Sequence, residues 1–189
     1  MSLFLNMFKV TRSKINGCVE LTPNIFLDER GSFVKVFHNE AFKALGLEAE
    51  FAEEYYSKSL MGVTRGLHFQ VPPEDHTKLV YCVEGSVFDV VLDLRLGSPS
   101  YGQCETFNLT ASDANMIYIP KGMAHGFCSL SESSTLIYKT STVYNPECDS
   151  GILWSSVQVD WPTKHPIISE RDVAFPSFNH FVSPFRFEQ

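Results

Sequence analysis

The sequence predicts an all-β domain, built as a sandwich or a barrel with a few short helices. Aromatic residues make up 13% of the chain and include sixteen Phe, which favours a β-rich core or an aromatic-lined cavity. Short extended runs alternate with turn residues at close spacing, a pattern typical of sandwiches and barrels. A chain of 189 residues suits one domain with a sizeable core, so we expect a single domain across residues 1–189.

The first clear element is a short helix from Asn39 to Leu45, which Asn39 can cap and Gly46 can end. A hairpin follows, because two apolar runs flank Glu84-Gly85. The second run has one apolar face and one face that alternates apolar with acidic residues. The expected strands are 79–83, 86–95, 103–109, 115–119, 126–130 and 134–140, and the chain from 162 onward is expected to wrap over the surface, ending in a loosely ordered tail at 177–189.

Charge and cysteine content limit the partners and the compartment. A net charge of -7 argues against nucleic acid as a partner, whereas a few local cations can still hold a small phosphorylated ligand. The five cysteines form no CxxC pair, which favours buried reduced thiols in a cytoplasmic protein. Met1 to Leu5 is too short for a signal peptide, and no apolar run is long enough to span a membrane.

The stretch Arg65 to Gln70, followed by Lys78, is the most informative part of the chain. His68 can change protonation near neutral pH, and Arg65 and Lys78 can hold an anion or a developing negative charge. The alternative is a surface histidine among ordinary solvated cations. A second segment, Pro120 to His125, presents another histidine at the start of a strand, although His125 can equally be a turn cap or a core residue.

A histidine after each of two β-hairpin segments is the layout of a cupin-type jelly roll, in which both histidines point into the barrel mouth. A metal-binding cupin usually offers HxHxxxE, which His68 and Glu74 fit, with His125 from the second motif. Gln70 replaces the second histidine, and an amide oxygen is a weak ligand for metals that imidazole suits. A metal-free pocket is therefore favoured, and a metal site remains the alternative.

Segments along nearly the whole chain match one family in order: 28–33, 65–70, 78, 85–95, 98–99, 120–127, 138–139, 144 and 169–172. Together they resemble the dTDP-4-dehydrorhamnose 3,5-epimerase family. The resemblance implies a cupin-type jelly roll, a homodimer with strand exchange at the N-terminus, and no metal or organic cofactor. It also implies an isomerase that epimerises a nucleoside-diphosphate 4-keto-6-deoxyhexose at carbons 3 and 5.

The resemblance also implies a role for each site residue. His68 matches the base, Asp172 the carboxylate that orients it, Lys78 the stabiliser of the enolate, and Tyr138 the acid. The expected substrate-binding residues are Arg30, Arg65, Gln70, Lys78, His125 and Tyr144, of which Tyr144 stacks near the nucleobase. Asp89 is a candidate partner of Lys78 or His125, and a buried structural acid is its alternative. Each of the other charged site residues could instead be an ordinary solvated charge, and each aromatic one a ring packed for structural reasons.

The chain departs from the family pattern at several positions. Glu53-Glu54-Tyr55 stands where relatives that use dTDP typically carry Gln-Asp/Asn-Asn, and Lys35 stands where Glu is frequent. Asp149 replaces Glu and Arg171 replaces Lys, which keeps the charge. These departures leave open the nucleotide, dTDP or CDP, and the sugar. The alternatives are a 3-epimerase, a 3,4-ketoisomerase, a non-catalytic sugar-nucleotide-binding cupin and a metal-dependent cupin oxygenase.

Overall fold

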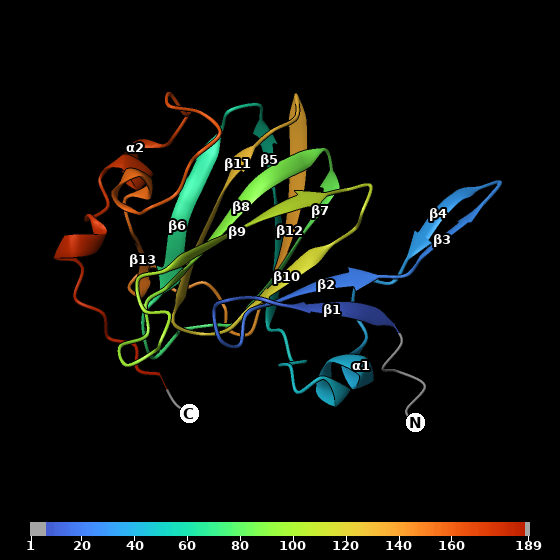
Figure 1. The fold of residues 1–189 in the computed structure, drawn as a ribbon, viewed down its shortest axis with the longest axis horizontal. Coiled ribbons are helices and arrows are strands. Elements are labelled where there is room, and N and C mark those ends of the chain that lie inside the picture. The colour runs from blue at the N-terminus through green and yellow to red at the C-terminus, as the bar shows by residue number, and fades with distance from the viewer. Residues whose placement is uncertain (1–6, 188–189) are drawn as a thin grey trace.

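In the computed structural model, which describes residues 7–187, two antiparallel sheets pack face to face and a two-stranded arm projects from one end (Figure 1). The six-stranded sheet contains, in spatial order, β1 (Phe8–Arg12), β2 (Val19–Pro23), β10 (Met116–Ile119), β7 (Lys78–Glu84), β12 (Ser133–Thr140) and β5 (Glu53–Leu60). The five-stranded sheet contains β13 (Asp149–Gly151), β6 (Thr64–Gln70), β11 (Met123–Ser129), β8 (Ser86–Asp93) and β9 (Cys104–Thr110). The arm is β3 (Ile25–Asp28) and β4 (Gly31–Val34). The prediction of an all-β jelly roll is confirmed.

Alternation along the strands decides which residues face the interior between the sheets. In β8, Val87 and Val91 belong to the interior cluster, whereas Val90 and Leu92 belong to a cluster on the outer face of the five-stranded sheet. That outer cluster is covered by the carboxyl-terminal segment through aromatic residues such as Phe185. The five-stranded sheet is therefore covered on both faces, and the outer cluster takes up five of the sixteen Phe: Phe69, Phe88, Phe178, Phe181 and Phe185.

The short helices lie at the edges of the sandwich. The helix α1 (Asn39–Ala44) buries Phe42 against the six-stranded sheet, and α2 (Glu170–Val173) lies beside β6. Two single 3₁₀ turns cover Trp154–Ser156 and Phe178–His180. No helix among residues 7–187 is long and apolar enough to cross a membrane. The segment Met1 to Leu5 lies outside the described residues.

The predicted hairpin at Glu84-Gly85 is wrong. β7 pairs with β10 and β12, whereas β8 pairs with β11 and β9, so the two strands lie in different sheets. Gly85 has a φ of +73°, and an added Cβ would lie 2.3 Å from the Ser133 carbonyl oxygen. Glu84 and Gly85 therefore form a corner at which the chain passes from one sheet to the other. Both β7 and β8 are apolar enough to be buried between other strands of their own sheets.

Three smaller expectations also differ from the structure. His38 rather than Asn39 is the N-cap of α1. The His38 ring accepts a hydrogen bond from the Ala41 N–H, and the Asn39 amide donates to the Ala49 carbonyl oxygen.

β11 begins at Met123, so His125 lies inside a strand rather than at its start. Residues 177–187 of the tail pack against the sheet, where Phe185 is buried and Leu96 bridges Arg186. The helix end at Gly46 is confirmed by its φ of +73°.

Candidate active site

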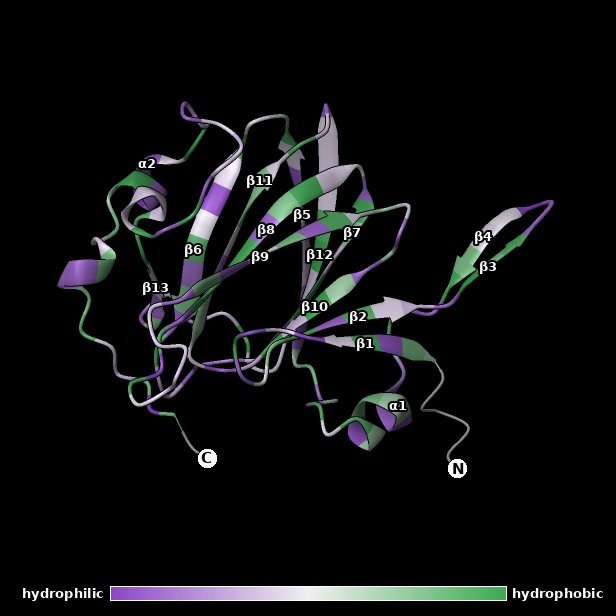
Figure 2. Ribbon diagram, in the orientation of Figure 1, coloured by the Kyte–Doolittle hydropathy of each residue, from purple (hydrophilic) through white to green (hydrophobic). Residues whose placement is uncertain are grey.

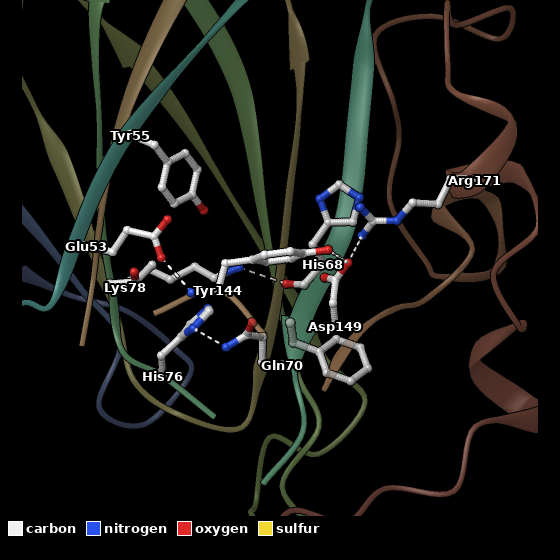
Figure 3. A pocket seen from close by; sticks show the side chains of 11 residues that line it. Glu53, Tyr55, His68, Gln70, His76, Lys78, Tyr144, Asp149 and Arg171 are labelled. Atoms are coloured by element: carbon white, nitrogen blue, oxygen red, sulfur yellow. Dashed lines mark hydrogen bonds and ion pairs between the residues drawn. The ribbon is translucent and has the colours of Figure 1, made fainter. Parts of the chain in front are cut away.

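Two adjoining cavities open between the sheets and share Tyr55, His68 and Lys78. The first, of about 300 Å³, is lined by Glu53, Tyr55, His68, Phe69, Gln70, His76, Lys78, Thr140, Tyr144, Asp149 and Arg171 (Figure 3). The second, of about 190 Å³, is lined by Tyr55, Ser57, Arg65, His68, Lys78, His125, Gly126, Phe127 and Tyr138. We call them the first and the second cavity.

Strand alternation directs the central side chains into these cavities. Lys78 lies on the inner face of β7 with Val80, and Tyr138 lies on the inner face of β12 with Leu136. On β6, Leu67 and Phe69 fill the outer cluster, which leaves His68 pointing inward. The base and the acid candidates therefore come from opposite sheets and meet across the cavity.

His68 is held by Asp172 of α2. Its Nε2 lies 2.8 Å from Asp172 Oδ1, and the Gly66 backbone N–H donates to Asp172 Oδ2 at 2.9 Å. Ser169 caps the helix by accepting the Asp172 backbone N–H. Burial lowers the pKa of His68 below 6.5 even though Asp172 opposes the shift. With Nε2 engaged, Nδ1 is the nitrogen that can take a proton from a ligand.

Lys78 is a buried cation between the two cavities. Its Nζ donates to the His68 carbonyl oxygen at 3.0 Å, which fixes the ammonium beside the base. Burial lowers the pKa of Lys78 to about 8, although Asp149 and Asp89 favour its charged form. The group therefore remains charged at neutral pH and can stabilise a developing oxyanion.

Tyr138 faces the second cavity from the opposite sheet. Its hydroxyl lies 3.0 Å from Ser57 Oγ, and its ring stacks on Tyr55 with centroids 4.8 Å apart. Burial raises the pKa of Tyr138 above its ordinary value, so the phenol stays protonated and can donate a proton.

His125, which lines the second cavity, forms a buried pair with Asp89 behind it. His125 lies opposite His68 in the register of β11 with β6, and its Nε2 is 2.7 Å from Asp89 Oδ2. Asp89 therefore pairs with His125, one of its two expected partners. The His125 ring also meets the Tyr138 ring at an edge, with centroids 6.1 Å apart.

Tyr144 lies across the mouth of the first cavity, between Glu53 and Asp149 (Figure 3). Its backbone N–H donates to Glu53 Oε2 at 2.6 Å, and its hydroxyl donates to Asp149 Oδ2 at 3.4 Å. Arg171 pairs with the same carboxylate at 2.9 Å. The residue is 57% exposed, and its ring offers a flat apolar face on which a nucleobase can stack.

Gln70 lines the first cavity, but its amide is already engaged. Its Nε2 donates to the Glu74 carbonyl oxygen and lies 3.3 Å from His76 Nδ1, and its Oε1 accepts the Asn145 N–H. Burial lowers the pKa of His76 to about 3, which keeps this second imidazole neutral. Among residues 7–187, no group of three or more His, Cys, Asp or Glu side chains is arranged to hold a metal ion.

The two expected arginines have different positions. Arg65 lines the second cavity and is held by Ser59 Oγ and the Lys58 carbonyl oxygen. Arg30 lines neither cavity, because it lies at the tip of the arm, where it pairs with Asp28 at 2.5 Å. Within one chain, the other expected site residues surround the two cavities, with Asp172 behind His68, and Arg30 is separate from them.

The sequence predicts no cavity role for Glu53, Tyr55, His76, Asp149 or Arg171. Four of these stand out only as departures from the family pattern, which leave the nucleotide open and assign no contact to the side chain. His76 gave no signal, because it precedes β7 and enters the cavity wall through a loop contact with Gln70.

Comparison with known proteins gives a consistent result. The model of the dTDP-4-dehydrorhamnose 3,5-epimerase family matches residues 12–180. The chain is 41% identical to the dTDP-4-dehydrorhamnose 3,5-epimerase of Shigella flexneri, over 87% of this chain and 92% of that protein. It is also 41% identical to the dTDP-4-dehydrorhamnose 3-epimerase of Streptomyces niveus, over 84% of this chain and 78% of that protein.

A solved structure extends the likeness to three dimensions. The dTDP-6-deoxy-D-glucose-3,5-epimerase of Legionella pneumophila, in complex with dTDP-4-keto-L-rhamnose, matches with a TM-score of 0.92 at 33% identity. The match covers 96% of this chain and 100% of that one. Since the family model, the curated relatives and the backbone agree over nearly the whole length, the chain belongs to the dTDP-4-dehydrorhamnose 3,5-epimerase family.

Proposed function

We propose that the protein is an isomerase that epimerises a dTDP-linked 4-keto-6-deoxyhexose at carbons 3 and 5. One observation carries the proposal: His68, Lys78 and Tyr138 line the same cavity of about 190 Å³. A base, a cation and an acid in one small cavity suit proton transfer at carbons next to a ketone. Simple binding of a sugar nucleotide does not require a base that faces an acid.

The reaction begins when His68 Nδ1 removes the proton from a carbon beside the 4-keto group. The electron pair of the C–H bond moves into the C–C bond, and the carbonyl oxygen becomes an enolate. Lys78 stabilises that oxygen, a contribution that is typically about 3–4 kcal/mol for one such donor. Asp172 accepts a hydrogen bond from the His68 Nε2–H and stabilises the imidazolium that forms.

Tyr138 then donates its proton to the same carbon from the other face. The C=C electron pair of the enolate forms the new C–H bond, and the pair on the oxygen re-forms the C=O bond. Each proton transfer to or from a placed side chain typically contributes about 10²–10⁴-fold to the rate. Exchange with solvent then removes the proton from His68 and returns one to Tyr138, and the same two steps at the second carbon complete the reaction. Substrate and product are isomers, so the sequence balances without an oxidant or a reductant.

Incubation with dTDP-4-keto-6-deoxyglucose in deuterated water, followed by NMR, tests the proposal. We expect deuterium at carbons 3 and 5, with inversion at both. Deuterium at carbon 3 alone would favour a 3-epimerase, the activity named for the Streptomyces niveus relative. A parallel reaction with the CDP-linked sugar tests the nucleotide. No exchange with any 4-keto sugar nucleotide would contradict the enzymatic assignment.

We also propose a homodimer in which the arm carries Arg30 to the site of the partner. The arm strands project from the body of the molecule (Figures 1 and 2). Phe26, Leu27 and Phe33 of the arm are 60%, 78% and 63% exposed. Apolar surface of this kind marks an interaction site, and a two-fold arrangement would bury both arms at once. Arg30 would then supply the diphosphate with a cation that its own chain places elsewhere.

A cytoplasmic location completes the proposal. All five cysteines are free, and Cys18, Cys82, Cys128 and Cys148 are buried. Buried reduced thiols are typical of a reducing compartment.

A further inference from the structure

Tyr55 holds the ring of the proposed acid from the neighbouring strand. Tyr55 of β5 lies directly opposite Tyr138 of β12 in the antiparallel register. The two rings are nearly parallel, with an interplanar angle of 14° and centroids 4.8 Å apart. Directly opposed residues on one sheet face form the closest side-chain pairs, so the stack fixes the plane of the Tyr138 ring.

Ser57 fixes the other end of the same side chain. It follows Tyr55 by two residues and therefore points to the same face of β5. Its Oγ lies 3.0 Å from the Tyr138 hydroxyl oxygen, so the phenol can turn neither its ring nor its hydroxyl without losing a contact. Tyr55 lines both cavities and Ser57 lines the second, which places this support beside the reacting sugar rather than in the core.

We infer that Tyr55 is a positioning residue for Tyr138, and that their stack decides how often an enolate is reprotonated with inversion rather than returned to the starting sugar. The inference rests on the proposed function. Burial and the neighbouring carboxylates of Glu53 and Asp149 raise the pKa of Tyr55 to about 12, so its own phenol stays neutral and adds no charge to the site.

The physical reason lies in competition between two proton donors for one enolate. After abstraction, protonated His68 can return a proton to the face it came from, whereas Tyr138 delivers a proton to the opposite face. In deuterated water the imidazolium exchanges with solvent, so a return leaves deuterium in a sugar that is not inverted. The ratio of labelled, uninverted sugar to inverted product therefore measures how well Tyr138 is placed, independently of how fast His68 removes the proton.

The test compares Tyr55→Ala, which removes the ring, with Tyr55→Phe, which keeps the stack. Stacked aromatic pairs have strengths that correspond to about a 2- to 12-fold change in population. We expect Tyr55→Ala to raise the ratio by about that factor. Tyr55→Phe should leave the ratio unchanged. Tyr56→Ala, which removes a ring from the opposite face of β5, is the matched control and should also leave the ratio unchanged.

A second comparison, made in the Tyr138→Phe variant, distinguishes a positioning role of Tyr55 from general damage to the structure. In Tyr138→Phe the acid is absent, so adding Tyr55→Ala should not change the ratio further. Equal losses of uptake and inversion in Tyr55→Ala would indicate a merely structural ring and overturn the inference, as would an unchanged ratio. Absence of both exchange and inversion in the unchanged chain would instead reject the proposed function, and the inference with it.

Discussion

His68 is partly buried and Lys78 is buried, and the pKa values of both are displaced in directions that suit the proposed proton transfer at neutral pH. Burial is the leading cause for both, because it disfavours each charged form. At neutral pH His68 is therefore uncharged, as the proposed base must be, and Lys78 still holds its proton below about pH 8. The same physical effect is therefore compatible with both proposed roles, a neutral base and a cation.

These shifts predict a bell-shaped pH profile for kcat/KM. Activity should rise with pH through a value below 6.5, where His68 loses its proton, and fall through about 8, where Lys78 loses its own. Tyr138 adds no limb in this range, since burial raises its pKa. Lys78→Arg should keep the charge and move the alkaline limb above 8. A profile that is flat from pH 5 to 9 would contradict these roles.

Asp172→Asn should lower kcat and leave KM nearly unchanged. The carboxylate holds His68 Nε2 at 2.8 Å but lines neither cavity, so substrate contacts survive while the orientation of the base is lost. By analogy with other His–Asp pairs, the loss should be on the order of 10³–10⁴-fold. Steady-state kinetics measure it, and a thermal melt checks the fold. Asp149→Asn, which changes the rim of the first cavity, should act mainly on KM.

At the scale of elements, the site depends on the close approach of β6 and β11. Gly66 sits where the two backbones meet, and an added Cβ would lie 2.6 Å from Gly126 Cα and 2.8 Å from the His125 carbonyl oxygen. Arg65, which precedes Gly66, and His68, which follows it by two residues, both line the second cavity. The contact between Gly66 and Gly126 therefore sets both the spacing of β6 and β11 and the positions of the site residues on β6.

Gly66→Ala should destabilise the protein by about 1–3 kcal/mol, because a methyl group forces two paired strands apart. Its backbone φ of +119° adds strain for any side chain. Gly46→Ala is a suitable control: its φ is +73°, but an added Cβ there meets nothing within 4 Å. Chemical denaturation of both variants measures the difference, and equal stabilities would show that the contact with Gly126 is unimportant.

At the scale of the whole molecule, the separation of Arg30 from the cavities predicts activity that two chains share. Arg30→Ala and His68→Ala homodimers should each be impaired. Mixing them under conditions that exchange subunits should restore about one quarter of the native sites, since half of the dimers are mixed and each contains one intact site. If Arg30 acts on its own chain, the mixture regains nothing. Sedimentation measurements on the unchanged chain check the dimer directly.

Much of the fold was predictable from local pattern. Close-spaced apolar runs with turn residues indicated an all-β sandwich, and the strands at 103–109, 115–119 and 134–140 correspond closely to β9, β10 and β12. Pairing was not predictable in the same way. Glu84-Gly85 has the composition of a hairpin turn, but the partner of each strand depends on packing between two sheets, which no local signal encodes.

The sequence by itself determined which residues were expected at the site: residue type singled out His68 and Lys78, and the resemblance to the family added Tyr138 and Asp172. The structure places His68, Lys78 and Tyr138 around one cavity, with Asp172 behind His68. Only the tertiary structure decided which atoms of these residues meet and what packs against them. The hydrogen bond at His68 Nε2, the stack of Tyr55 on Tyr138 and the isolation of Arg30 on the arm join segments far apart in the chain. Such contacts arise from packing, and packing is decided by the whole chain at once.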